Sequence, residues 1–276
     1  MAAFILQVAC DIPVVVSASG VFDYLPPADC IESDWLGRAV LVPFGAQTLV
    51  GIVVGTASSS DLPIEKLKNI FTILPFVPHA DASWLDLVRF IARYYQRGLG
   101  EVALPALPIA LRQARNFSDD GASLRTGQAS WKKWLKLPAT PAPLQLGDAL
   151  PLNNKQTDVL NALRSASTQP QLLFGVTGSG KTEIYLQYVS EILQADETAQ
   201  VLILVPEINL TPQLAERLNQ RFGADAVATL HSKLTESTRL LNFWRAANGQ
   251  ARVILGTRLA VLAMLPHLKA IVVDEE

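Results

Sequence analysis

Residues 175–182 have the sequence Gly-Val-Thr-Gly-Ser-Gly-Lys-Thr. This octapeptide matches the G-x-x-x-x-G-K-[ST] pattern of a phosphate-binding loop, in which glycines let the backbone approach an anion closely. Amides at the start of the next helix point at the phosphates, the lysine neutralises them, and the last hydroxyl binds Mg²⁺. The pattern predicts a nucleotide site between a strand and a helix. Its predicted nucleotide-binding residues are Gly175, Thr177, Gly178, Ser179, Gly180, Lys181 and Thr182.

The region around this loop, residues 151–276, alternates apolar runs with helical segments. Near-continuous apolar runs are typical of strands buried on both faces of a parallel sheet. One helix is predicted after Thr182, with Tyr185 on its apolar face, and another from Thr211. The pattern therefore predicts an α/β lobe with a parallel sheet. The apolar runs predicted as strands are 172–174, 201–205, 253–255 and 270–273.

The last apolar run ends in two carboxylates, Asp274 and Glu275. Beside a phosphate loop, the aspartate would hold Mg²⁺ together with Thr182, and the glutamate would orient or deprotonate the attacking water. Many apolar strands end in acidic residues, so this pair alone is weak evidence for a nucleotide site. Together with the phosphate loop upstream it becomes strong evidence. The carboxyl edge of the strands is also where open α/β sheets bind ligands. The predicted catalytic residues are Lys181, Asp274 and Glu275, with Thr182 and Asp274 as Mg²⁺ ligands.

Residues 1–80 carry short β-branched runs separated by turn residues, which predicts a small all-β barrel or sandwich. The clearest runs are 14–16, 39–42 and 51–54. Apolar residues then recur at helical spacing between Ser83 and Arg97, which predicts an amphipathic helix over 83–97. Its aromatic residues, including Tyr94 and Tyr95, are interpreted as core, and a base-stacking platform is the alternative.

Residues 111–150 are predicted to be a linker with one short basic helix at 131–137. Basic residues outnumber acidic ones here, so the segment is either a solvated surface or a patch that contacts phosphates.

Overall the 276 residues are 50% hydrophobic and 17% charged with a net charge of −2, which excludes extensive disorder and a generally basic nucleic-acid binder. The chain stops directly after an apolar run, which indicates a cut in mid-domain.

Cysteine and hydrophobicity patterns exclude two further classes of protein. Two cysteines cannot build a disulfide framework or a four-cysteine zinc site. No apolar run is long enough to span a bilayer, and no secretion signal is present, so we expect a cytoplasmic protein without a membrane partner. His231 has no metal-ligand partner nearby in the sequence and is interpreted as structural.

Taken together, the motifs resemble superfamily 2 helicases, and more closely the primosomal protein N′ (PriA) family of replication-restart helicases. Gln156 falls where such helicases carry an adenine-reading glutamine, which makes it a candidate adenine contact. Thr211 and Arg258 lie in segments similar to DNA-contacting motifs, although each segment also fits an ordinary βα loop. The segments similar to helicase motifs I, Ia, Ib and the opening of II are 175–185, 205–213, 253–258 and 274–276.

The resemblance extends to the N-terminal region, through residues 22–25 and 42–45. It implies a pocket for the 3′ end of a nascent DNA strand, in which aromatic rings stack on the terminal base and a carboxylate accepts a hydrogen bond from the 3′-hydroxyl. The residues alone instead indicate core positions for the two aromatics and a turn position for the aspartate. The pocket residues implied by the resemblance are Phe22, Asp23, Tyr24, Gly45 and Lys68.

The resemblance implies a multidomain chain: a 3′-end DNA-binding domain at 1–110, a linker or residual winged-helix region at 111–150, and a RecA-like P-loop helicase lobe at 151–276, truncated at motif II. The implied activity is ATP- and Mg²⁺-dependent 3′→5′ unwinding at stalled or branched forks, which initiates primosome assembly. The implied partners are forked and single-stranded DNA, other primosome proteins and single-stranded-DNA-binding protein. Zinc is expected only in the missing C-terminal part.

Two other interpretations remain open. Because the second helicase lobe and its catalytic arginines are missing, the chain as it stands would be a DNA 3′-end and fork-binding module without turnover. A related nucleic-acid-stimulated ATPase, such as a restriction or remodelling motor, is the weaker alternative, because residues 22–24 and 42–45 argue against it.

Overall fold

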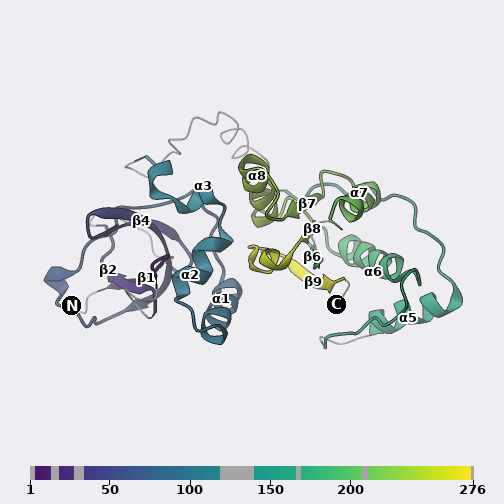
Figure 1. Cartoon of the computed structure of the whole chain (residues 1–276), viewed down its shortest axis with the longest axis horizontal. Helices are drawn as coiled ribbons and strands as arrows, with labels where there is room; N and C mark the ends of the chain where they lie inside the picture. The colour runs from purple at the N-terminus through teal and green to yellow at the C-terminus, as the bar shows by residue number, and fades with distance from the viewer. Residues whose placement is uncertain are drawn as a thin grey trace. The chain divides into compact units, whose positions relative to one another are not determined.

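The computed structural model describes residues 4–13, 19–27, 34–118, 140–165, 169–206 and 211–274. The chain divides into two compact units (Figure 1). The first comprises Met1–Leu137, Leu234–Trp244 and Leu262–Met264, and the second comprises Pro138–Lys233, Arg245–Val261 and Leu265–Glu276. The predicted helix at 131–137 and the predicted strand at 14–16 lie outside the described residues.

The first unit contains a five-stranded antiparallel sheet with the strand order β2-β1-β4-β3-β5. Two backbone hydrogen bonds join its opposite edges: Leu25 N–H donates to the Lys68 carbonyl at 3.0 Å, and Ile70 N–H donates to the Leu25 carbonyl at 2.9 Å. The sheet therefore curls partly closed, in agreement with the predicted small all-β domain. Its strands are β1 (Ile5–Cys10), β2 (Val21–Tyr24), β3 (Ala39–Phe44), β4 (Gln47–Ala57) and β5 (Thr72–Ile73).

Alternate residues of these strands form one apolar core, because successive side chains of a strand point to opposite faces. Leu6, Val8 and Cys10 of β1 are fully buried in it, together with Val40 and Val42 of β3. Burial, with a smaller effect of the neighbouring Asp11 charge, raises the pKa of the Cys10 thiol to about 12. Cys10 is therefore a core residue and not a reactive thiol.

Helix α1 (Ala82–Tyr94) confirms the predicted amphipathic helix. Asp81 caps its start, where the carboxylate accepts the Trp84 N–H at 2.7 Å. The prediction that its aromatics are core is correct for Trp84 and wrong for Tyr94 and Tyr95, which are 69% and 66% exposed. Tyr94 is the last residue of the helix and Tyr95 follows it, and both lie outside the buried face of α1. The unit's other helices are α2 (Leu99–Ala103), α3 (Ile109–Arg112), η1 (Ile64–Lys66), η2 (Leu104–Ala106) and η3 (Ala114–Asn116).

The second unit contains a four-stranded parallel sheet with the order β7-β8-β6-β9. It confirms the predicted α/β lobe and three of the four predicted strands. β7 was not predicted, because its sequence Val-Ala-Thr-Leu is no continuous apolar run. The strands are β6 (Gln200–Leu204), β7 (Val227–Leu230), β8 (Val253–Gly256) and β9 (Leu268–Val273). Helices α5 (Asn154–Ser165) and α6 (Lys181–Ala195) precede β6, α7 (Thr211–Phe222) lies between β6 and β7, and η5 (Arg258–Leu262) follows β8. Helix α8 (Glu236–Ala247) lies between β7 and β8 in the chain, and most of it groups with the first unit.

Helices α6 and α7 pack on one face of this parallel sheet. Leu186 and Val189 of α6 and Phe222 of α7 are at most 1% exposed and form a core cluster with strand residues such as Val201 and Leu255. Burying side chains of this size stabilises the fold by about 1.5–3 kcal/mol each. This packing fixes the start of α6, where the predicted phosphate loop ends, against the sheet.

The predicted strand at 172–174 is absent from the structure. Leu172 and Phe174 are 88% and 91% exposed, and the segment has no strand assignment. A strand needs a neighbour that supplies backbone partners, and β9 is hydrogen-bonded along one side, to β6. On its other side no strand is present among the described residues, and Ile271 and Val273 of β9 are 52% and 51% exposed. The segment before the loop therefore stays outside the sheet.

Within the described ranges, no helix has the length and apolarity needed to cross a membrane.

Candidate nucleotide site and DNA-binding residues

The glycine-rich segment forms a loop that leads directly into α6, as its sequence predicts. Lys181 is the first residue of that helix. Its Nζ turns back into the loop and donates to the carbonyl oxygens of Gly175, at 2.6 Å, and Val176, at 3.1 Å. A cation thus sits inside the curve of the loop, in front of a helix N-terminus, where a phosphate group would meet both.

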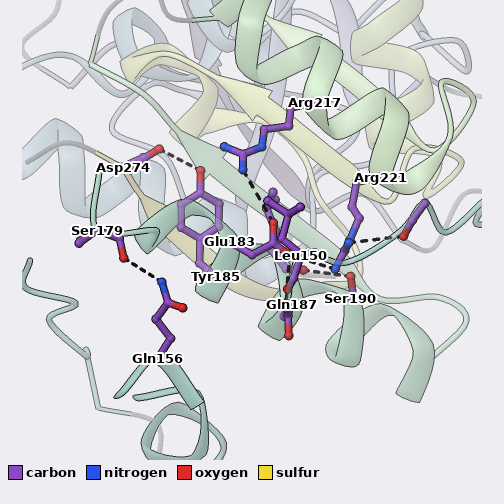
Figure 2. A network of polar contacts seen from close by, with 12 residues as sticks. Leu150, Gln156, Ser179, Glu183, Tyr185, Gln187, Ser190, Arg217, Arg221 and Asp274 are labelled. Atoms are coloured by element: carbon purple, nitrogen blue, oxygen red, sulfur yellow. Dashed lines mark hydrogen bonds and ion pairs between the residues drawn. The ribbon is translucent and has the colours of Figure 1, made fainter. Parts of the chain in front are cut away.

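Gly180 occupies a position that other residues would strain. Its φ of +84° is in the left-handed region, and a Cβ there would lie 2.4 Å from Nε2 of Gln156. The Gln156 amide donates to the Ser179 carbonyl at 2.9 Å (Figure 2). The Gln156 side-chain oxygen accepts the Asn153 N–H at 2.9 Å. The structure therefore brings the candidate adenine contact against the loop. Thr177, Gly178 and Ser179 form the exposed rim of the loop.

Asp274, the predicted Mg²⁺ ligand, follows the end of β9 and is half-buried. Its Oδ2 accepts a hydrogen bond from the hydroxyl of Tyr185 on α6, at 2.9 Å (Figure 2). Burial, followed by the Asp274 charge and this hydrogen bond, raises the pKa of Tyr185, against smaller effects of Thr182 and Arg217. The phenol is thus a permanent donor to the carboxylate. Glu275 lies outside the described residues.

The polar role of Tyr185 was not predictable from its place on an apolar helix face. The role of Glu183, a 7% exposed carboxylate on the first turn of α6, was not predicted either. Glu183 accepts the Leu150 N–H at 3.2 Å and makes ion pairs with Arg221, at 3.5 Å, and Arg217, at 3.8 Å (Figure 2). These partners compensate the buried charge and tie α6 to α7. The sequence did contain a signal for Glu183, because an acidic residue directly after the phosphate-loop threonine lies at a helix N-terminus, where negative charge is stabilised.

Two predicted DNA contacts lie beyond the carboxyl ends of the parallel strands. Arg258 is exposed and opens η5 just after β8. Thr211 opens α7 after β6, and its side chain lies outside the described residues. Because parallel strands end at one edge of a sheet, Arg258, the start of α7 and Asp274 all follow that edge. The described residues contain no group of three or more His, Cys, Asp or Glu side chains placed to hold a metal.

The predicted 3′-end pocket residues lie on and near β2 in the first unit. Phe22 meets Phe44 edge-on, with ring centroids 5.1 Å apart. Gly45 is exposed in the turn after β3 with a φ of +57°, and no heavy atom lies within 4 Å of where its Cβ would be. Asp23 is half-buried opposite Gln7 of β1.

Tyr24 and Lys68 differ in how accessible they are. The Tyr24 ring is 4% exposed, and its hydroxyl donates to the Pro43 carbonyl at 3.1 Å, so it is a core residue, as the sequence alone indicated. Its buried ring has no free face for stacking on a base. The Lys68 side chain is exposed, and its carbonyl pairs with Leu25, the residue after β2. The structure thus brings Lys68 near the end of β2.

Both units match known families. Residues 7–108 match the 3′DNA-binding domain (3′BD) family of PriA, and residues 153–276 match the DEAD/DEAH box helicase family. Replication restart protein PriA of Haemophilus influenzae is 35% identical over 314 residues, covering 93% of this chain and 42% of that protein. The chain belongs to the PriA family. The PriA protein of Treponema pallidum is 31% identical over 277 residues, covering 98% of this chain and 38% of the relative.

The order of the two matches agrees with PriA architecture as the sequence predicted it, a DNA-binding domain followed by a helicase domain. The chain spans about two fifths of the length of these relatives. The alignment with the Haemophilus protein is longer than this chain, so that relative contains stretches that this chain lacks.

Proposed function

We propose that this chain is the DNA- and nucleotide-binding part of an ATP-dependent 3′→5′ DNA helicase that recognises stalled or branched forks and initiates primosome assembly. The observation that carries the proposal is the phosphate loop with Lys181 turned into it, next to an α/β edge that ends in Asp274. Lys181 would exchange its two carbonyl partners for the β- and γ-phosphates. Gln156, already bonded to the loop, would read the adenine.

The residues at this edge suit Mg²⁺, which prefers hard oxygen ligands and few protein groups. The Thr182 hydroxyl and the Asp274 carboxylate would hold the ion, and Glu275 would orient or deprotonate the attacking water. When bound, Mg²⁺ neutralises charge on the phosphate oxygens during transfer. The protein's part is to fix these groups: α6 carries Thr182, and Asp274 directly follows β9.

ATP hydrolysis in the presence of forked DNA tests the proposal. We expect DNA-stimulated hydrolysis from a longer form that spans the full length of the relatives, and none from this chain. An arginine contact to the transferring phosphate contributes about 10³–10⁵-fold to the rate in P-loop GTPases, and in the proposed helicase the second lobe would supply it. Hydrolysis by the longer form that survives Lys181→Ala would contradict the assignment.

A second candidate is a DNA 3′-end-binding module without turnover, favoured by the first unit. Exposed Lys68 would contact the terminal phosphate, Asp23 would accept a hydrogen bond from the 3′-hydroxyl, and Phe22 and the open turn at Gly45 would border the terminal base. We expect tighter binding to a fork with a 3′-hydroxyl than to the same fork ending in a dideoxynucleotide, by about 10-fold.

Matched variants sharpen that DNA experiment. Lys68→Ala should weaken binding of the 3′-hydroxyl fork, whereas Lys66→Ala, an exposed lysine two residues away, should change it little. Asp23→Asn should reduce the preference for the hydroxyl end. Equal affinity for both ends in the unsubstituted chain would count against the pocket.

The wider assignments are parts of the same proposal. Forked and single-stranded DNA, primosome proteins and single-stranded-DNA-binding protein are the proposed partners, and the cytoplasm is the proposed location. Thr211 and Arg258 would contact the DNA backbone. Zinc is proposed only for the part of the longer relatives that this chain does not cover. The domain limits at 110 and 150 are likewise proposals.

A further inference from the structure

Tyr185 links the two elements of the nucleotide site. It lies one helical turn after Lys181 and three residues after Thr182 on α6, and its side chain is 5% exposed. Its hydroxyl donates to Oδ2 of Asp274 at 2.9 Å, beyond the end of β9 (Figure 2). Residues three and four apart share a helix face, so the hydroxyl lies on the side of α6 that carries the phosphate-loop residues.

The backbone of Asp274 is hydrogen-bonded on one side only among the described residues, to β6, so its carboxylate needs a partner such as Tyr185. Strand β9 pairs with β6, and the Asp274 N–H continues that ladder by donating to the Leu204 carbonyl at 2.9 Å. Ile271 and Val273 of the strand are about half exposed. The backbone position of Asp274 is thus fixed by β6, and the direction of its carboxylate is fixed by Tyr185.

One carboxylate oxygen is thereby engaged and the other is left for a ligand. Residues behind a metal ligand commonly set its orientation in this way, and their removal typically lowers metal affinity by about 10–100-fold. Tyr185 is buried by the same packing that holds α6 on the sheet, so its hydroxyl is presented from a rigid element.

We propose that Tyr185 is a positioning residue that orients the Asp274 carboxylate for Mg²⁺ and so couples the phosphate-loop helix to the metal site. This inference rests on the proposed nucleotide function. Tyr185 itself makes no contact with the nucleotide in this proposal. Its effect should therefore appear in the Mg²⁺ dependence of nucleotide binding and not in binding without the metal.

The test titrates Mg²⁺ into this chain with a fluorescent ATP analogue and compares Tyr185→Phe with the unsubstituted chain. We expect Tyr185→Phe to raise the Mg²⁺ concentration at half-saturation by about 10-fold and to leave analogue affinity in EDTA unchanged. Tyr188→Phe removes a hydroxyl from the same helix, where Tyr188 is half-buried, and should change neither value.

A merely structural role would give a different pattern, in which Tyr185→Phe weakens analogue binding equally with and without Mg²⁺. In an Asp274→Ala background the effect of Tyr185→Phe on the Mg²⁺ half-saturation should disappear, since alanine leaves the Tyr185 hydroxyl no side-chain acceptor at that position. An unchanged half-saturation in Tyr185→Phe, with normal binding by the unsubstituted chain, would overturn this inference alone. No analogue binding by the unsubstituted chain would overturn the proposed function as well.

Discussion

Two features of the structure favour glycine at position 180. Its φ lies in the left-handed region, and a Cβ at this position would lie 2.4 Å from Nε2 of Gln156. Gly180→Ala should destabilise the chain by about 1–3 kcal/mol and weaken nucleotide binding, because it strains the loop and displaces Gln156. Gly178→Ala is the matched control: its φ is +79°, but no heavy atom lies within 4 Å of its Cβ position. Urea unfolding and analogue binding measure both, and equal losses would contradict the role of Gln156.

Cys10 gives a prediction about pH and reactivity. With its pKa raised to about 12 by burial, only about one thiol in 10⁴ is ionised at pH 8. In a Cys30→Ser background, iodoacetamide should leave the folded chain unmodified at that pH and modify it once it is unfolded in urea. Since the thiol must lose its proton in a buried site, reactivity should rise only as the pH nears the raised pKa. Rapid native labelling at pH 8 would contradict the burial.

Residue roles were predictable from the sequence where a motif fixes both residue type and spacing. Lys181 is in the loop and Gln156 is against it, as predicted. The polar role of Tyr185 was not predictable from periodicity, because a tyrosine on a buried helix face looks apolar until the sheet places Asp274 opposite its hydroxyl.

At the scale of elements, exposure predicts how much each apolar side chain stabilises the fold. Leu172→Ser should change the free energy of unfolding by no more than about 0.5 kcal/mol, because Leu172 is 88% exposed. Leu186→Ala on α6 should cost about 2–5 kcal/mol, because Leu186 is 1% exposed in the core. Denaturant unfolding compares the two. A large loss from Leu172→Ser would place residues 172–174 in the sheet after all.

The sequence predicted strands and helices correctly where the local residue pattern determines them. It predicted them poorly where their formation depends on pairing or packing with other parts of the chain. The runs at 39–42, 51–54, 201–205 and 253–255 correspond to β3, β4, β6 and β8. Residues 172–174 have an equally apolar sequence but no strand to pair with among the described residues. The exposure of Tyr94 and Tyr95 has a similar cause, since helical spacing does not show where the packing surface ends.

At the scale of the molecule, each unit carries one predicted recognition site. The 3′DNA-binding domain match lies in the first unit, and the nucleotide loop, Asp274 and Arg258 lie in the second. The sequence predicted a DNA-binding domain followed by a helicase lobe, and the order of the two family matches agrees with it. It did not predict that residues 234–244 and 262–264 group with the first unit, because their sequence is continuous with the helicase match.

Nucleotide binding by residues 175–182 is the central property that we propose for this chain. The direct measurement is binding of a fluorescent ATP analogue to this chain in Mg²⁺, beside Lys181→Ala. Among the described residues, Lys181 Nζ donates to two loop carbonyls, so its loss should leave the melting temperature unchanged and lower the affinity by about 10-fold or more. Saturable binding that ATP displaces and that Lys181→Ala weakens is the predicted result. Equal binding by both chains, or none by either, would contradict it.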